Sequence, residues 1–209
     1  MLHGAQQEGS TTGVYAAACA SDFATDTAMF NLPRQIASAL SLGGPTGFYD
    51  KACTSSHLAL HSAWERIQGK GPCSAALVVG VTLMLQPSVS ASLLLNGILS
   101  PTGHCLPLDQ QCNGLVRGEA SVALVLRKYD DNKRDQYPAL KASAVTSNSA
   151  TLPSLLSPDQ EAQERALKQA QAGHSVDLLH LHGISQPMAD TIELLALQSG
   201  WPGGGTLLN

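Results

Sequence analysis

The chain has 209 residues, of which 44% are hydrophobic and only 13% are charged, and its formal net charge is −4. This length accommodates one sizeable domain but not two ordinary ones. The sequence lacks the clustered Lys and Arg that a nucleic-acid-binding protein needs, so this class is excluded. The apolar run at residues 75–85 is too short to cross a membrane. Because globular proteins usually have about twice this share of charged residues, we expect a partner subunit or another part of the same domain to cover some of the surface.

The five cysteines do not form a recognisable framework. Their number is odd and no two are spaced as C-x-x-C, so neither a disulfide scaffold nor a zinc site is predicted. This use of cysteine favours a reducing compartment. The first eight residues lack the basic and apolar regions of a signal peptide. We therefore expect a soluble cytoplasmic protein, with an organelle such as the plastid as the open alternative.

Strand and helix patterns alternate in the first half of the chain. Residues 14–20 form a short apolar run typical of a buried strand, and residues 27–42 have apolar positions at helical spacing. A turn is predicted at residues 42–45, and a second helix runs through residues 58–68 to a Gly-Lys-Gly-Pro stop. Residues 75–81 form a continuous apolar run rich in valine, which is typical of a strand covered on both faces.

The second half of the chain continues the same alternation. The predicted strands are residues 120–126, 139–145 and 176–183; the predicted helices are residues 158–172 and 190–198. Residues 129–136 read as a charged turn, residues 146–156 as an exposed loop and residues 202–205 as a flexible turn. The alternation favours an α/β fold.

Cys53 lies between an extended segment and the helix at residues 58–68, whose first turn begins with Thr54, Ser55 and Ser56. A thiol at a helix N-terminus is next to unpaired N–H groups and the positive end of the helix dipole, and both stabilise the thiolate. A thiolate can accept an acyl group from a thioester. By position alone, however, a single cysteine is more often a small core residue.

The other four cysteines are predicted to be inert. Cys19 lies in an alanine-rich apolar run and is interpreted as a core residue; Cys73 and Cys105 are interpreted as structural, and Cys112 falls in a polar loop.

Four motifs, in order, resemble those of β-ketoacyl synthases. The sequence D-K-A-C-T-S-S-H-L-A-L-H at residues 50–61 resembles the nucleophile motif D-T-A-C-S-S-S-L-x-A-L-H, and G-I-L-S-P-T-G-H-C at residues 97–105 resembles G-x-L-S-P-D-G-R-C. The sequence G-L-V-R-G-E at residues 114–119, preceded by Asp109, resembles G-Y-V-R-G-E. His182-Gly183, followed by Pro187, Asp190, Ile192, Glu193 and Leu197, resembles H-G-T-G-T-P-L-G-D-P-I-E-A-x-A-L.

The resemblance implies an α/β thiolase-like fold of layered αβαβα architecture, built from two similar halves and present here only in part. Residues 1–209 would be a partial ketosynthase domain, with an N-terminal half that lacks its first strands and extends to about residue 150. Residues 151–209 would be the start of the C-terminal half.

The resemblance also implies an activity, which is acyl-thioester condensation in polyketide or fatty-acid biosynthesis. Cys53 would be the nucleophile and His182 the first catalytic histidine, with no bound cofactor or metal. The substrates would be phosphopantetheine thioesters carried by acyl carrier protein or coenzyme A, and the protein would be a homodimer that binds neither nucleic acid nor membrane.

The chain departs from the family pattern near both motifs that carry the chemistry. Ile184 and Gln186 replace threonines that bind the pantetheine arm in the family, Ser185 replaces a glycine, and Lys51 replaces the threonine two residues before the cysteine. The chain ends about where the second histidine motif, K-x-N-I-G-H, should begin, so we expect this chain alone not to complete decarboxylative condensation.

Three alternatives remain open at this stage. The first is a degenerate, non-catalytic ketosynthase fragment that acts as a scaffold or dimerisation partner. A degradative thiolase would share the fold but fits the S-P-x-G and V-R-G-E segments less well. A cysteine hydrolase fits least, because no Asp or Asn partner for His182 stands out.

Overall fold

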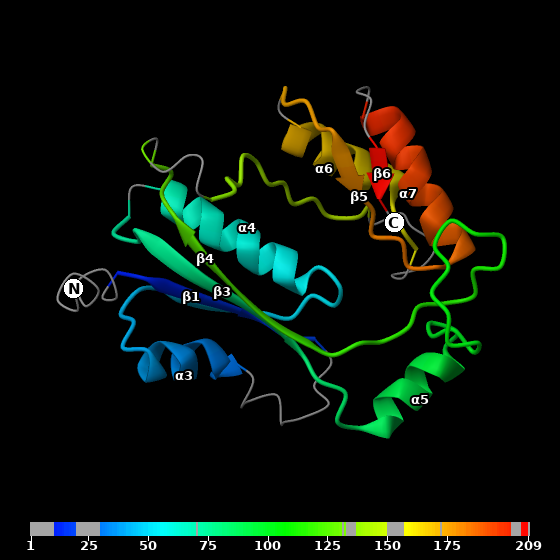
Figure 1. The fold of residues 1–209 in the computed structure, drawn as a ribbon, viewed down its shortest axis with the longest axis horizontal. Coiled ribbons are helices and arrows are strands. Elements are labelled where there is room, and N and C mark those ends of the chain that lie inside the picture. The colour runs from blue at the N-terminus through cyan, green and yellow to red at the C-terminus, as the bar shows by residue number, and fades with distance from the viewer. Residues whose placement is uncertain are drawn as a thin grey trace. The chain divides into compact units, whose positions relative to one another are not determined.

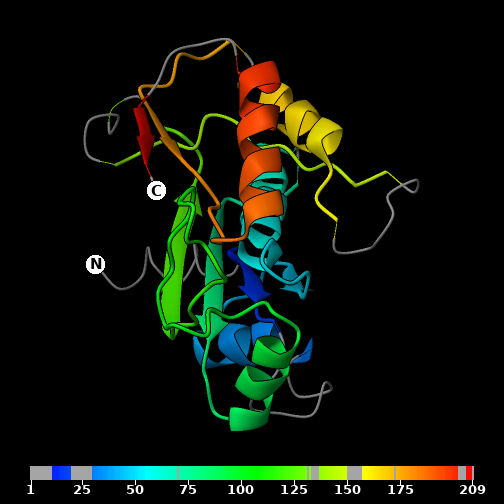
Figure 2. The same cartoon turned by 90° about the vertical axis from the view of Figure 1, so that its right-hand side faces the viewer.

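The computed structural model describes residues 11–19, 30–69, 71–130, 132, 137–149, 157–171, 173–201 and 206–208 (Figures 1 and 2). The chain divides into two compact units. The first comprises Met1–Val89 and Gly118–Ala139, and the second comprises Ser90–Arg117 and Leu140–Asn209. Helix α5 (Pro87–Leu95) runs across the division in sequence.

A mixed four-stranded sheet is the centre of the first unit. Its strands are β1 (Gly13–Ala17), β2 (Thr46–Tyr49), β3 (Ala75–Thr82) and β4 (Ala120–Arg127), in the order β2-β1-β3-β4. Strand β1 pairs in parallel with β2 and β3, and β4 is antiparallel to β3. Parallel neighbours require crossover connections, and these contain helices α3 (Leu32–Ala39) and α4 (Ser55–Gln68).

The two crossover helices cover opposite faces of the sheet (Figure 1). Strand β1 is therefore buried along its whole length. On the α4 side, Tyr15 and Ala17 pack in a core with Ala59, Ala63 and Ile67, whose four-residue spacing places them on one face of the helix. Full burial of a side chain the size of Ile67 stabilises the fold by roughly 1.5–3 kcal/mol.

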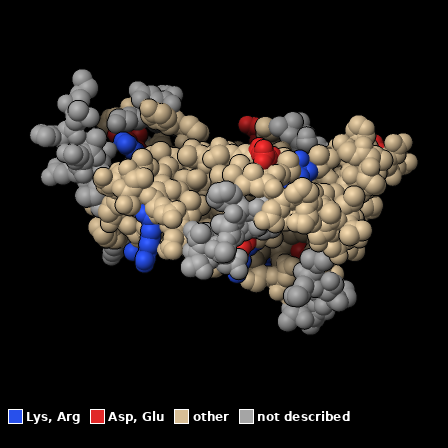
Figure 3. All heavy atoms as spheres, turned by 90° about the horizontal axis from the view of Figure 1, so that it is seen from below, with Lys and Arg blue, Asp and Glu red and all other residues tan. Residues whose placement is uncertain are grey.

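Strand β4 is exposed along most of its length. Val122, Leu124 and Val125 have relative exposures of 54%, 47% and 64%, so apolar side chains remain on its surface. Charged side chains are also sparse on the molecular face shown in Figure 3. Both observations agree with the low charged fraction of the sequence.

The second unit contains two helices and a short two-stranded parallel sheet. Helix α6 (Gln160–Gln171) packs against α7 (Pro187–Gly200), and β5 (Leu178–His180) pairs with β6 (Thr206–Leu208). A Cβ atom at Gly200 would lie 3.2 Å from the Cα atom of Glu164, so a glycine lets the two helices approach closely.

Asp159 precedes α6 and caps its first turn. Its carboxylate accepts hydrogen bonds from the backbone N–H groups of Ala162 (3.0 Å) and Ser149 (2.6 Å). The Ser149 bond first, and then the Ala162 bond, lower the pKa of Asp159 below its ordinary value. One carboxylate thus holds both the helix terminus and the loop before it.

Most predicted elements are present, and their ends differ by a few residues. The helix predicted at residues 27–42 spans only Leu32–Ala39 among the described residues, with residues 27–29 outside them. Residues 202–205, predicted as a flexible turn, also lie outside the described residues. Helix α5 and strand β6 were not predicted, whereas β2 is the extended segment predicted before Cys53.

The strand predicted at residues 139–145 is wrong. These residues are described, and they form no strand. Apolar alternation defines a possible strand, but a strand also needs a neighbouring backbone to complete its hydrogen bonds. Here the next residue, Thr146, instead donates its hydroxyl hydrogen to the carbonyl oxygen of Ala162 in α6, at 2.8 Å.

Candidate active site

Cys53 lies in a tight turn between β2 and α4, in the first unit, and is exposed. The preceding residue, Ala52, has a φ of 50°, in the left-handed region that a residue with a Cβ atom enters at a cost of roughly 1–2 kcal/mol. Such strain persists only where surrounding contacts enforce it, and it is concentrated at functional sites. The backbone is therefore forced into an unusual shape directly before the cysteine.

The hydroxyl of Ser55 holds this turn together. It donates a hydrogen bond to the carbonyl oxygen of Ala52 at 2.6 Å and accepts one from the backbone N–H of Lys51 at 2.8 Å. The Thr54 hydroxyl donates to the carbonyl oxygen of Lys51 at 2.8 Å. Ser55 is only 4% exposed, so its bonds are largely shielded from water. They fix the backbone on both sides of Cys53.

Helix α4 begins two residues after Cys53 and is 14 residues long. The N–H groups of a helix's first turn have no acceptor within the helix, and together with the helix dipole they favour negative charge nearby. Lys51 is exposed beside the turn. The position can therefore stabilise a thiolate while leaving the sulfur accessible to a substrate.

Cys19 is the second cysteine of this region, and its prediction as a core residue is wrong because it is exposed. It follows β1, and the buried part of its apolar run ends before it, at Ala18. Although the residue is exposed, its sulfur is partly desolvated, which raises the pKa of the Cys19 thiol, and the charges of Asp50 and Cys53 raise it further. The Cys19 thiol is therefore a neighbour of the turn that contains Cys53.

The remaining cysteines divide between core and surface. Cys73 is buried, with 1% exposure, and its thiol donates to the carbonyl oxygen of Ala75 at 3.1 Å, so its structural role is confirmed. Cys105 is exposed, which contradicts the same prediction for it, and Cys112 is half-buried.

His182 belongs to the second unit and lies two residues after β5, where it is exposed. Its backbone N–H donates to one carboxylate oxygen of Glu193 at 2.7 Å, and the N–H of Gly183 donates to the other at 3.0 Å. Glu193 lies in helix α7, so the carboxylate ties the histidine segment to that helix. The two residues predicted as catalytic thus occupy different units, each with its own supporting hydrogen bonds.

The segment after His182 also anchors residues 97–115. Ser185, fully buried at a φ of 59°, accepts a hydrogen bond from the Leu106 N–H at its hydroxyl and one from the Gly114 N–H at its carbonyl oxygen. The buried carboxylate of Asp190 accepts from the Leu108 N–H at 3.0 Å. Two of the resembling motifs are therefore joined in one hydrogen-bonded structure.

The sequence predicts Cys53 and His182 as catalytic residues, but it does not reveal which side chains hold their backbone in place. Ser55 was placed only in the first helical turn, and Glu193 only in a motif. No sequence signal predicts these contacts. Several hydroxyl residues follow Cys53, and Glu193 lies 11 residues after His182, so only the turning of the chain decides which side chain reaches which backbone group.

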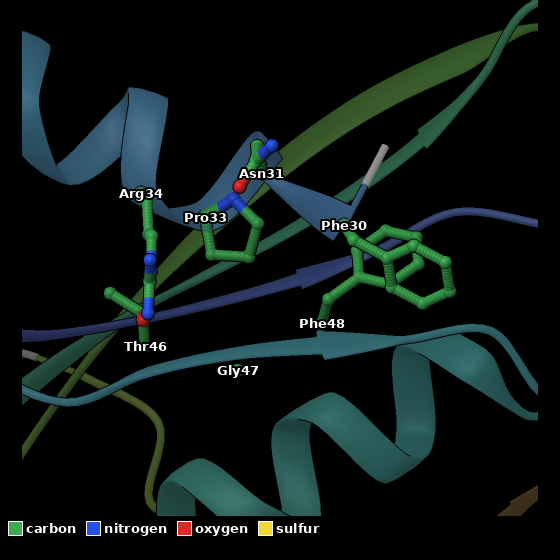
Figure 4. A pocket seen from close by; sticks show the side chains of 7 residues that line it. All are labelled: Phe30, Asn31, Pro33, Arg34, Thr46, Gly47 and Phe48. Carbon is green, nitrogen blue, oxygen red and sulfur yellow. The ribbon is translucent and has the colours of Figure 1, made fainter. Parts of the chain in front are cut away.

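A hollow of about 370 Å³ lies elsewhere in the first unit, between α3 and β2 (Figure 4). The rings of Phe30 and Phe48 meet edge to face at one end, with centroids 5.3 Å apart, and Arg34 extends toward Thr46 at the other. Among the residues that the structure describes, no cysteine or histidine lines this hollow, so it offers no nucleophile.

The described part of the chain contains no cluster of three or more side chains suited to hold a metal ion. Within the same residues, no helix is long and apolar enough to span a membrane.

Comparison with known families gives two matches in sequence. The family model of the β-ketoacyl synthase N-terminal domain matches residues 3–132, and that of the β-ketoacyl synthase C-terminal domain matches residues 137–205.

Curated relatives include polyketide synthase PksR from Bacillus subtilis, with 32% identity over 90% of this chain and 8% of the relative. The mellein synthase of Phaeosphaeria nodorum is 33% identical over 83% of this chain and 10% of the relative. The chain therefore spans only about a tenth of the length of these proteins.

Solved structures with a similar fold include the ketosynthase from module 6 of the bacillaene synthase of Bacillus subtilis 168. It has 28% identity and a TM-score of 0.75, over 92% of this chain and 36% of that structure. An oxazolomycin ketosynthase domain from Streptomyces albus JA3453 has 24% identity and a TM-score of 0.84, over 95% of this chain and 39% of that structure. The predicted α/β thiolase-like fold is thus confirmed, and the chain covers part of it.

Proposed function

Because this chain belongs to the β-ketoacyl synthase family, as part of a ketosynthase domain related to those of polyketide synthases, we propose that it takes part in acyl-thioester condensation with Cys53 as the nucleophile. The observation that carries this proposal is the strained turn in which Ser55 fixes the backbone around the exposed cysteine.

The first step is transfer of an acyl group to the sulfur. The Cys53 thiolate attacks the thioester carbonyl, a new carbon–sulfur bond forms, and the bond to the carrier sulfur breaks. The departing thiolate takes up the proton that Cys53 gave up, so the exchange is balanced. The N-terminus of α4 supports the thiolate before the attack.

His182 acts in the second step, in which a malonyl thioester loses carbon dioxide and the resulting carbanion attacks the acyl-cysteine carbonyl. A carbon–carbon bond forms, the acyl carbon–sulfur bond breaks, and Cys53 leaves as its thiolate. An imidazole N–H can stabilise the negative charge that develops on the thioester oxygen. The Glu193 carboxylate supports this role because it binds the backbone N–H groups of His182 and Gly183 and so restrains the loop. Holding acyl group and carbanion side by side removes much of the entropic barrier.

The substrates we propose are phosphopantetheine thioesters delivered by acyl carrier protein or coenzyme A, with polyketide or fatty-acid products. We also propose that the protein forms a homodimer. The apolar, weakly charged surface of β4 supports an interface of some kind.

The first step can be tested by mass spectrometry. Trypsin should release residues 52–66, in which Cys53 is the only cysteine, whereas Cys73, Cys105 and Cys112 all fall in residues 71–117. After incubation of the folded protein with an acyl-coenzyme A, we expect an acyl adduct on residues 52–66. Cys53→Ser should abolish it, and Cys105→Ser, which removes another exposed thiol, should not. No adduct, or equal labelling of residues 71–117, would exclude Cys53 as the nucleophile.

The role of His182 needs a separate measurement. The readout is decarboxylation alone, because this chain is not expected to complete condensation. The parent protein should release labelled carbon dioxide from a malonyl thioester above the rate without protein, and His182→Ala should release less. Equal release from both proteins would remove His182 from the mechanism.

One observation favours a second candidate, a non-catalytic ketosynthase that serves as a scaffold. Where the family has hydroxyls for the pantetheine arm, this chain has Ile184 and Gln186, and the Gln186 side chain donates to the carbonyl oxygen of Gly97 at 3.3 Å. Ser185 is fully buried and already bonded. Absence of any acyl adduct, together with a stable dimer in light scattering, would favour this candidate.

A further inference from the structure

Two exposed cysteines follow neighbouring parallel strands of the same sheet. Strands β1 and β2 are in register from Val14 opposite Thr46 to Ala17 opposite Tyr49, and the Ala18 N–H donates to the carbonyl oxygen of Tyr49 at 3.3 Å. Cys19 is the second residue after β1. On the neighbouring strand, β2, the turn that contains Cys53 begins directly after Tyr49.

The spacing of the strands brings these two segments close together. Extending the register places Lys51 opposite Cys19, at the strand spacing of about 4.8 Å, and the Cys19 thiol is hydrogen-bonded to the backbone of Ala52, the residue before Cys53. A disulfide needs roughly 4.4–6.8 Å between the two Cα atoms, so a bond between these cysteines requires the turn to fold Cys53 back toward Cys19. The left-handed Ala52 and the Ser55 bonds turn the second segment sharply, so that it does not extend away from β1. Both side chains are exposed, which leaves them open to a small oxidant.

We propose that Cys19 and Cys53 form a reversible disulfide when the protein meets a hydroperoxide. The Cys53 thiolate attacks one peroxide oxygen, giving a sulfenic acid and releasing the other oxygen as water after protonation. The Cys19 sulfur then attacks the sulfenic sulfur, and a second water leaves. Two thiols and one hydrogen peroxide thus give one disulfide and two waters.

The surroundings distinguish the roles of the two sulfurs. Cys53 precedes the N-terminus of α4, which favours its thiolate and therefore the first oxidation. Partial burial of the sulfur, followed by the charges of Asp50 and Cys53, raises the pKa of Cys19, so this residue stays largely a thiol until the sulfenic acid forms. Cys19 is then the resolving cysteine.

The consequence for activity rests on the proposed function, although formation of the disulfide does not. A disulfide would block acyl transfer and also protect Cys53, because a sulfenic acid without a resolving thiol is oxidised further to the irreversible sulfinic acid.

The tryptic peptides make the test direct. Residues 1–34 contain Cys19 alone and residues 52–66 contain Cys53 alone. After treatment of the folded chain with hydrogen peroxide, alkylation of remaining thiols and digestion without reductant, we expect residues 1–34 linked to residues 52–66. Dithiothreitol should separate them. The link should persist in Cys105→Ser and be absent in Cys19→Ser, where dimedone should instead trap sulfenic acid on Cys53.

Three outcomes would overturn the proposal. The first is a link of either peptide to residues 71–117 in comparable yield. The second is oxidation of Cys53 to sulfinic acid in the parent protein without a link. The third is that the fraction of Cys53 that dithiothreitol can no longer return to the thiol is equal in the parent and Cys19→Ser proteins. Acyl labelling of the reduced protein, measured in parallel, reports on the proposed function separately, because it does not require Cys19.

Discussion

Ser55→Ala should loosen the turn that contains Cys53. The substitution removes a donor to the Ala52 carbonyl oxygen at 2.6 Å and an acceptor from the Lys51 N–H at 2.8 Å, in a residue that is 4% exposed. Each such bond contributes a net 0.5–1.5 kcal/mol, so the two together are worth about 1–3 kcal/mol. The better helix propensity of alanine offsets at most roughly 0.5 kcal/mol.

The loss should be visible in two measurements. Urea unfolding should show a lower free energy of unfolding by about 1–3 kcal/mol, and the left-handed conformation of Ala52 should no longer be held. The rate at which a thiol reagent modifies Cys53, followed on residues 52–66, should then change from that of the parent protein.

Ser38→Ala is the matched control. Ser38 is exposed on α3, and surface substitutions of this kind usually stay within about 0.5 kcal/mol. If Ser55→Ala matched Ser38→Ala in stability and retained the parent rate of Cys53 modification, the hydroxyl would not be what holds the turn.

Three further predictions concern the two units separately. Gly114→Ala should unfold at a markedly lower temperature, because Gly114 has a φ of 133° and a Cβ atom there would lie 2.5 Å from the Leu99 carbonyl carbon. Gly118→Ala, with open space around the position, should melt like the parent protein. Equal losses of melting temperature in the two variants would contradict the clash. Burial first, and then neighbouring charges, raise the pKa of Tyr15 from 10.0 to about 12, so the stability linked to its neutral form is complete below pH 10 and is lost as the pH rises toward 12. The unfolding free energy of Tyr15→Phe should therefore fall less than that of the parent protein over this range. Equal falls in the unfolding free energy of both proteins would refute the assignment. Hydrogen bonds from Ser149 and Ala162 lower the pKa of Asp159, so the stability that its carboxylate contributes is present above the ordinary pKa of 3.8 and is lost as the pH falls through the lowered pKa. The acid-induced drop in melting temperature should be smaller in Asp159→Asn than in the parent protein. An unchanged drop would remove Asp159 as a cause.

The sequence was sufficient for features that depend on neighbouring residues. The periodic apolar positions of α4 and the continuous apolar, valine-rich run of β3 determine these elements locally, and both were predicted within a few residues. The position of Cys53 before a helix was readable for the same reason. The family was also recognisable, because four motifs in a fixed order do not require knowledge of contacts.

Only the tertiary structure decided which residues hold the backbone around Cys53 and around His182. Residues 139–145 have a strand pattern but no strand, Cys19 has core-like neighbours in sequence but is exposed, and Glu193 reaches back to the backbone of His182. Each outcome depends on a segment distant in sequence, or on a turn that changes the chain's direction. Local patterns set the preference of a backbone segment, whereas its hydrogen-bond partners and the exposure of its side chains are set by what packs beside it.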